Sequence, residues 1–328
     1  MKKTITTSLI GALAISLSAN TLACSNVLWN SEHGTVVTRT MDWMESTQPA
    51  LMSVRKGEER SLHGIPGGGT YKTKNDYLAI AAYGKLVAEG VNEQGLQISV
   101  QYYREMKLPK AQSSDVSQVE LAGYLLSQTD NVDQAVKLAS ELEVGLVSLS
   151  HLPEPPLFHY ILADKDGGRA LLQFDEDGLQ IYRGDEAAVV TNNPGQKIHL
   201  AAWDQKKSEI IQQGGFNRKI NLGAGNTDAQ QRFIFSNYYL AQLKTSSSPI
   251  NAMMSVEGTA FKVPQQAAYG AADSAMPTYA TEYGITYNLD SGDVVFKYMG
   301  GDHWTQQRWN FKTLLASQQN IHRALDRS

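Results

Sequence analysis

The chain has 328 residues, of which 42% are hydrophobic, and its formal net charge at neutral pH is −4. This balance, with no basic block and no basic stripe between aromatic residues, excludes nucleic acid as an expected partner. A chain of this length can bury one large hydrophobic core. Cys24 is the only cysteine, so an internal disulfide is excluded.

The first 23 residues follow the pattern of a secretory signal peptide, with a positive start and a short apolar run at residues 9–17. Thr21 and Ala23 occupy the small-residue positions that precede a cleavage point. The apolar run is shorter than the roughly 20 residues that a membrane helix needs, and no later stretch reaches that length. We therefore expect residues 1–23 to be removed during export to the periplasm and residues 24–328 to form one soluble domain.

Strands dominate the first part of this expected domain. Residues 25–43 read as two strands around a turn at residues 32–34, which places Cys24 at the beginning of a strand. Further strands are predicted at residues 77–83, 85–90 and 96–103, which are separated by turn residues.

Helices and more strands are predicted in the middle of the chain. Leu, Ala and Val recur at helical spacing in residues 116–126 and 132–142, and Asn131 can cap the second of these helices. Short apolar runs separated by Asp-Gly turns then predict a four-stranded meander. Its strands are expected at residues 158–163, 170–174, 179–182 and 188–191.

The last part of the chain repeats this alternation. Helices are predicted at residues 227–243 and 249–256, strands at 283–288 and 294–298, and a weakly helical tail at 310–325. Two antiparallel sheets interleaved with pairs of helices indicate an α+β sandwich, with the sheets inside and the helices outside.

Cleavage before Cys24 would give this residue a free α-amine beside its thiol. The amine has an ordinary pKa near 8 and the thiol one near 8.5, so the amine can take the thiol proton and later protonate a departing nitrogen. This chemistry suits amide hydrolysis. Arg39 and Asp42 end the hairpin that begins at Cys24, where a cation would favour the thiolate and a carboxylate would orient the amine.

Cys24 also occupies the position of the acylated cysteine in a lipoprotein, which would be tethered to a membrane and non-catalytic. Lipoprotein signals favour leucine where Thr21 stands, and this disfavours that interpretation. Arg39 and Asp42 by themselves would indicate a surface ion pair, and Trp43 could belong to the core or to a pocket. The seven histidines show no zinc-ligand spacing, so we expect no metal and no cofactor.

Five segments occur in an order and spacing that are specific together, although each is weak alone. They are Cys24 after the cleavage point, residues 39–43 (RTMDW), 90–96 (GVNEQGL), 191–194 (TNNP) and 232–233 (RF). In this pattern the chain resembles the choloylglycine hydrolase family, which includes penicillin V acylases, over essentially its whole mature length. The resemblance implies an amino-terminal nucleophile hydrolase with an αββα four-layer sandwich.

The resemblance also implies a role for each matched residue. Cys24 would be the nucleophile with its amine as base, Arg39 the guanidinium near the sulfur, and Asp42 the partner of the amine. Asn192 would help to hold the oxyanion, and Arg232 would be a second active-site arginine. Without the resemblance, Asn192 reads as a turn former and Arg232 as a solvated residue in the first turns of a helix.

One further matched position concerns the substrate. Members that cleave bile salts tend to carry asparagine where this chain has Tyr102, and penicillin V acylases carry tyrosine, so bile salt hydrolysis is the alternative function. We expect Tyr102 to join Asn192 at the oxyanion, and Trp43, Met44 and Tyr103 to line a slot for an apolar acyl group. Phenoxyacetyl groups and the acyl chains of N-acyl homoserine lactones both suit such a slot, and Gram-negative relatives act on both.

The resemblance bears on partners as well. Gram-positive members have a longer segment between the positions of Asn192 and Arg232, and that segment helps to assemble a tetramer. The corresponding stretch is shorter here. The expected partners are a small-molecule amide with an apolar acyl group and further copies of the chain in a homo-oligomer, with a tetramer as one form.

Overall fold

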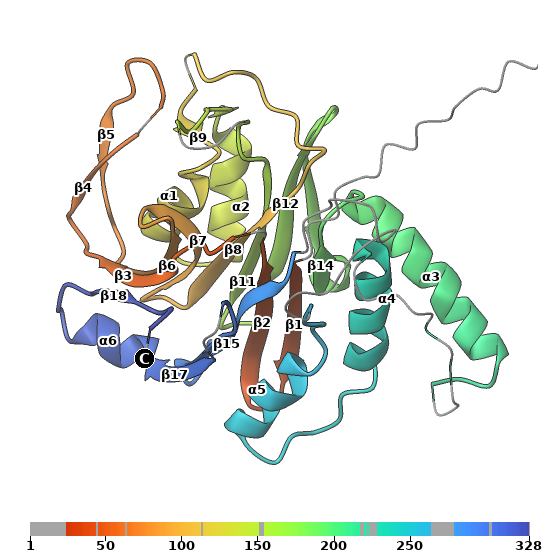
Figure 1. Cartoon of the computed structure of the whole chain (residues 1–328). Coiled ribbons are helices and arrows are strands. Elements are labelled where there is room, and N and C mark those ends of the chain that lie inside the picture. The colour runs from red at the N-terminus through yellow and green to blue at the C-terminus, as the bar shows by residue number, and fades with distance from the viewer. Residues whose placement is uncertain are drawn as a thin grey trace, which may run out of the picture.

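The computed structural model describes residues 24–43, 45–62, 64–112, 114–150, 154–216, 220, 222, 228–263, 279–301 and 304–327. Over these ranges the chain forms two antiparallel sheets that face each other, with helices on both outer faces (Figure 1). The predicted α+β class and the four-layer αββα sandwich are confirmed. The described residues include no helix that is long and apolar enough to cross a membrane.

The first sheet has six strands and begins directly after Cys24. In spatial order they are β14 (Val189–Thr191), β1 (Ser25–Ser31), β2 (Gly34–Asp42), β15 (Thr281–Asn288), β16 (Asp293–Tyr298) and β17 (Thr305–Asn310). The predicted β1–β2 hairpin is confirmed. Ser25 lies opposite Thr40 on one side and Thr191 on the other. The start of β1 therefore meets the ends of two neighbouring strands.

The second sheet has eight strands. In spatial order they are β13 (Gly178–Arg183), β12 (Arg169–Asp175), β11 (Phe158–Asp164), β8 (Leu96–Tyr102), β7 (Leu86–Asn92), β6 (Tyr77–Ala82), β3 (Ala50–Val54) and β18 (His322–Ala324). Two small sheets pair β4 (Glu59–Ser61) with β5 (Thr70–Lys72), and β9 (Val116–Ser117) with β10 (Val144–Gly145).

The predicted four-stranded meander is wrong in its last strand. Strands β11, β12 and β13 are neighbours in the second sheet, whereas β14 pairs with β1 in the first. A short 3-10 helix, η1 (Gly184–Ala187), separates β13 from β14 and carries the chain from one sheet to the other. This crossing brings Asn192, directly after β14, to the beginning of β1.

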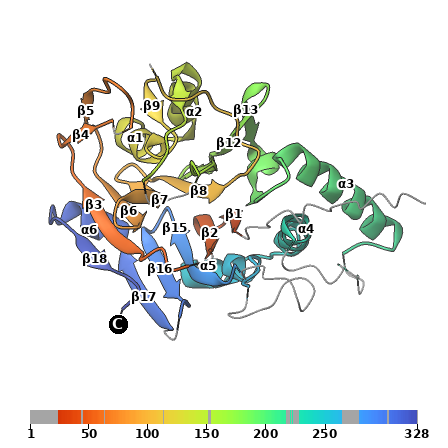
Figure 2. The same cartoon turned by 45° about the horizontal axis from the view of Figure 1, so that its top comes forward.

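Helices cover the outer face of each sheet (Figure 2). On the second sheet lie α1 (Leu121–Gln128) and α2 (Val132–Glu141); on the first lie α4 (Ala229–Leu240) and α5 (Pro249–Glu257), with α3 (Gln196–Gln212) against α4 and α6 (Phe311–Ala316) near β17. Helix α1 begins later than predicted, because Val116 and Ser117 pair with β10. The Asn131 cap is confirmed, since its side chain accepts a hydrogen bond from Gln134 N.

Three apolar layers hold the sandwich together. One lies between the two sheets and contains Leu28 and Val37 of the first sheet and Val91 of the second. The other two lie under the helices, and Val27 and Val36 belong to the layer beneath α4 and α5. Successive residues of β1 and β2 thus point alternately toward the other sheet and toward the helices.

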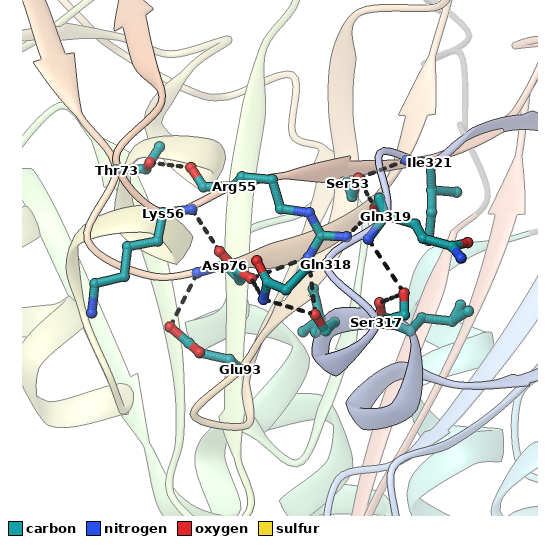
Figure 3. A network of polar contacts seen from close by, with 12 residues as sticks. Ser53, Arg55, Lys56, Thr73, Asp76, Glu93, Ser317, Gln318, Gln319 and Ile321 are labelled. Carbon is teal, nitrogen blue, oxygen red and sulfur yellow. Dashed lines mark hydrogen bonds and ion pairs between the residues drawn. The ribbon is translucent and has the colours of Figure 1, made fainter.

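The last residues of the chain are fastened to β3 and the turn after it by a polar network (Figure 3). Arg55 pairs with Asp76 at 3.1 Å, and the same carboxylate accepts hydrogen bonds from Lys56 N at 2.5 Å and Gln318 Nε2 at 2.8 Å. Arg55 also donates to the carbonyl of Gln319. We call these five residues the Asp76 clamp. The clamp holds the C-terminal segment at the edge of the second sheet.

Candidate active site

Cys24 lies at the beginning of the first sheet, and its side chain and its backbone nitrogen point in different directions. It precedes β1 and has 2% of its surface exposed. By the alternation of β1, its side chain shares a face with Asn26 and Leu28, which points toward the second sheet. Its backbone nitrogen, which the predicted cleavage would turn into an α-amine, points toward the segment after β14.

The thiol side of the site contains Arg39. This residue shares its face of β2 with Val37 and Met41, and it lines the same cavity as Cys24. Burial raises the pKa of the Cys24 thiol, and the positive charge of Arg39 is the largest influence that lowers it. Arg39 is therefore placed where the predicted guanidinium near the sulfur should be.

The amine side contains Asn192 and Arg232. The Cys24 nitrogen donates to Asn192 Oδ1 at 2.5 Å, and Arg232 Nη2 donates to the same oxygen at 3.0 Å. Arg232 Nη2 also lies 3.4 Å from the Cys24 carbonyl oxygen, and its Nε lies 3.3 Å from Ser25 Oγ. Both residues are buried, so Arg232 is not the solvated helix residue that its position alone suggested.

Asp42 lies on this side too, because it shares with Thr40 the face of β2 that is opposite to Arg39. Its two carboxylate oxygens accept hydrogen bonds from Thr281 Oγ1 at 2.6 Å and Thr40 Oγ1 at 3.4 Å. Burial raises the pKa of Asp42 to about 7, although the charge of Arg232 lowers it. In this structure Asn192 Oδ1 accepts from the Cys24 nitrogen, and the pairing of Asp42 with the amine stays a prediction.

A small cavity of about 70 Å³ opens at the thiol. Its lining is mostly apolar and includes Trp43 and Tyr102 together with Leu86, Val87 and Phe158. The rings of Trp43 and Tyr102 are 6.1 Å apart, and Trp43 Nε1 donates to Tyr83 Oη at 2.7 Å. Trp43 is thus a pocket residue, and an apolar group could be held directly beside the sulfur.

The pattern of the family described as linear amide C–N hydrolases, choloylglycine hydrolase family, matches residues 24–302. The chain belongs to this family. The chain is therefore a linear amide C–N hydrolase, and the thiol, the buried cations and the adjoining cavity are its candidate active site. The match begins at the residue whose thiol and nitrogen organise the site.

Solved structures share the fold of this choloylglycine hydrolase family member. Penicillin V acylase from Agrobacterium tumefaciens has a TM-score of 0.72 and 21% identity, covering 86% of this chain and 85% of that one. A mutant conjugated bile acid hydrolase from Clostridium perfringens has a TM-score of 0.72 and 13% identity, covering 93% and 97%. An uncharacterised protein of Paramecium bursaria Chlorella virus 1 is 24% identical over 289 residues, which is 84% of this chain and 96% of that protein.

Two further residues of this hydrolase that were expected to line the slot, Met44 and Tyr103, are not confirmed there. Met44 lies outside the described residues. Tyr103 does not line the Cys24 cavity; its ring is buried, stacks on His159 with 5.2 Å between centroids, and its hydroxyl donates to Asp175 at 2.7 Å. Consecutive strand residues point in opposite directions, and Tyr102 takes the direction of the cavity. Tyr103 is therefore not among the residues that line the cavity at Cys24.

Residues that the sequence did not single out support those that it did. Glu89 forms a buried ion pair with Arg39 at 3.0 Å, and His199 Nε2 lies 2.8 Å from the carbonyl oxygen of Asn192. The Asn192 Nδ2 group in turn donates to the carbonyl of Tyr102 at 2.8 Å. Glu89 could have been identified from the sequence, because it is a carboxylate within the apolar run of strand β7. His199 lies on α3, which no predicted element covered.

Proposed function

We propose that this protein removes apolar acyl groups from small amides, with penicillin V and N-acyl homoserine lactones as its substrate types and Cys24 as its nucleophile. The observation that carries the proposal is the apolar cavity at the Cys24 thiol, lined by Trp43 and Tyr102. An acyl group held there would present its carbonyl carbon to the sulfur.

The proposed reaction has two steps. The α-amine of Cys24 takes the thiol proton, the sulfur attacks the carbonyl carbon, and the C–N bond breaks as the protonated amine passes its proton to the leaving nitrogen. Water then cleaves the thioester with the amine again as base. One Nδ2 hydrogen of Asn192 is held by Tyr102 O, which leaves the other as a donor for the oxyanion. In this arrangement the Tyr102 carbonyl orients Asn192.

The size of the cavity favours a narrow acyl group. Its volume of about 70 Å³ lies well below the roughly 300 Å³ at the lower end of sites for drug-sized ligands. A phenoxyacetyl group or a thin alkyl chain suits such a slot better than the fused rings of a bile acid. Tyr102 at the position where bile salt hydrolases tend to carry asparagine supports the same preference.

Export is part of the proposal, because the base exists only after residues 1–23 are removed before Cys24. The family match begins at this residue, which supports cleavage at this point. Edman sequencing and the intact mass of protein purified from the periplasm test it. A free Cys24 is expected, and a lipid-bearing, blocked terminus would instead indicate the lipoprotein alternative.

The substrate is tested with a panel of penicillin V, penicillin G, N-acyl homoserine lactones and glyco- and taurocholate. Release of the free acid is expected from penicillin V or the lactones, with kcat/KM at least about tenfold above that for the bile salts. The Cys24→Ala variant, checked for native folding by circular dichroism, is expected to lose at least about 10³-fold in rate. Faster hydrolysis of the bile salts would establish the alternative function, and an active Cys24→Ala variant would exclude the mechanism.

A further inference from the structure

An ion pair is buried between the two sheets directly behind the cavity. Arg39 of β2 and Glu89 of β7 meet at 3.0 Å, and their side chains are 1% and 0% exposed. Glu89 shares a face of its strand with Val91, which packs in the apolar layer between the sheets. Two charges have thus been placed in a buried layer that holds apolar side chains such as Val91 and neutral polar side chains such as Asn26 and Ser99, which are hydrogen-bonded to each other.

The Arg39 guanidinium is held from both sheets at once. Its Nη1 donates to Glu89 Oε1 and lies 3.2 Å from Tyr283 Oη, and its Nη2 donates to the carbonyl of Val100 at 2.8 Å. Tyr283 belongs to β15 of the first sheet, whereas Glu89 and Val100 belong to the second. These contacts hold the guanidinium between the two sheets, and Arg39 is one of the residues that line the Cys24 cavity.

Glu89 contributes a charge that a purely structural link would not need. Removing two ions from water costs as much as their attraction returns, so a buried pair is weak evidence for a role in stability. A neutral acceptor would be enough to hold the Arg39 N–H groups, as the Val100 carbonyl shows. A carboxylate also carries a negative charge, and this charge offsets part of the effect of the Arg39 positive charge on the Cys24 sulfur.

We propose that Glu89 is a positioning residue for amide hydrolysis, which holds Arg39 beside Cys24 and limits how strongly that arginine favours the thiolate. The inference rests on the proposed role of Cys24 as the nucleophile. A thiolate that forms too readily is a weaker nucleophile and is more exposed to oxidation in an oxidising compartment. Glu89 would keep the thiol protonated until the amine of Cys24 removes its proton.

The other charged groups around this pair are few among the described residues. Cys24 is influenced by Arg39 and Asp42 of β2 and by Arg232 of α4. Glu89 is influenced by Arg39 and by Tyr283 of β15, and Tyr287 of β15 lies close enough to be influenced by Glu89. The two tyrosines have pKa values raised well above 10 by burial, so they stay neutral over the range in which the thiol titrates.

The rate of alkylation by iodoacetamide against pH measures the Cys24 thiol directly, because the chain has no other cysteine. The Glu89→Gln variant keeps an acceptor for Arg39 but removes the charge, so the apparent pKa of the thiol is expected to fall by about 1. The Glu89→Asp variant keeps the charge in a shorter side chain and is expected to shift the pKa in the same direction by less. The kcat of Glu89→Asp for amide hydrolysis should lie between the values for the wild type and for Glu89→Gln.

Glu282 provides the matched control. It is also a buried carboxylate, but it accepts its hydrogen bonds from Ser46 and Thr47 and not from Arg39. Glu282→Gln is expected to lower the melting temperature and leave the thiol pKa unchanged. An unchanged thiol pKa in folded Glu89→Gln would overturn the proposal, and if that variant does not fold, an unchanged pKa in Glu89→Asp would do so. Because alkylation needs no substrate, this result is independent of whether the substrate panel succeeds.

Discussion

Two arginine–carboxylate ion pairs in this protein have nearly the same nitrogen–oxygen distance but different surroundings. Arg39 and Glu89 meet at 3.0 Å between the sheets, and Arg55 and Asp76 meet at 3.1 Å in the Asp76 clamp. Burial raises the pKa of Glu89, although the charge of Arg39 and hydrogen bonds with Tyr283 and Arg39 lower it. Burial also opposes the charge of Asp76, but hydrogen bonds, first that from Lys56 N, outweigh it and lower its pKa.

The difference separates a pair that holds structure from one that sets the properties of a neighbour. Asp76 is surrounded by donors, so its charge is stabilised where it lies and the C-terminal segment is fixed by it. Glu89 keeps a raised pKa in spite of Arg39 and Tyr283, so its charge is less fully stabilised where it lies. The pair between the sheets also lies at the nucleophile, whereas the clamp lies at the sheet edge.

The largest effect is expected from breaking the inner pair. Arg39→Met leaves the Glu89 charge buried and unpaired, so the free energy of unfolding measured in urea should fall by about 3–5 kcal/mol. Amide hydrolysis should fall at least about tenfold, since the thiol loses its neighbouring cation. The double variant Arg39→Met with Glu89→Leu should regain most of the stability but none of the activity. Recovery of activity in the double variant would contradict the role of Arg39.

A smaller effect is expected at the clamp. Asp76→Asn removes a charged acceptor from several donors and should lower the free energy of unfolding by about 1–3 kcal/mol at pH 7, with kcat/KM unchanged. Because the folded pKa of Asp76 is lowered, its contribution is present above the unfolded pKa of about 3.9 and is lost as the pH falls through the folded value. Urea titrations from pH 7 to pH 3 should therefore show the wild type and the variant converging at the acid end.

The smallest effect is expected for a pair on the surface. Arg183 and Asp133 meet at 2.6 Å, but their side chains are 47% and 84% exposed. Arg183→Ala should change the free energy of unfolding by less than about 0.5 kcal/mol, since water screens the pair. A loss as large as that of Asp76→Asn would show that distance, and not burial, decides what such pairs contribute here.

Much of the fold was predictable because its signals are local. The β1–β2 hairpin, the Asn131 cap and the strands around Asn92 depend on turn residues and on short alternating patterns. The errors concern places where a distant partner decides. Residues 116–117 form β9 because β10 pairs with them, and β14 joins the first sheet because β1 offers it an edge. The tail at 310–325 was predicted as helical, and α6 (Phe311–Ala316) confirms part of this prediction, but residues 322–324 form a strand at the edge of the second sheet.

The candidate site divides in the same way. Cys24, Arg39 and Asp42 were predicted from one hairpin, and strand alternation already places Arg39 and Asp42 on opposite faces. Asn192 and Arg232 came only from the resemblance to a known family, since 168 and 208 residues of sequence separate them from Cys24. Such separations leave no periodic signal in a sequence.

The sequence by itself determined that one cysteine follows an export-like segment, that a strand begins directly after it, and that Arg39 and Asp42 return beside it. The tertiary structure decided the rest. The crossing of β14 into the first sheet delivers Asn192 to the Cys24 nitrogen, and the packing of the two sheets sets Glu89 against Arg39. Local patterns depend on the period of a strand, whereas these contacts depend on which strand edges and which sheet faces meet.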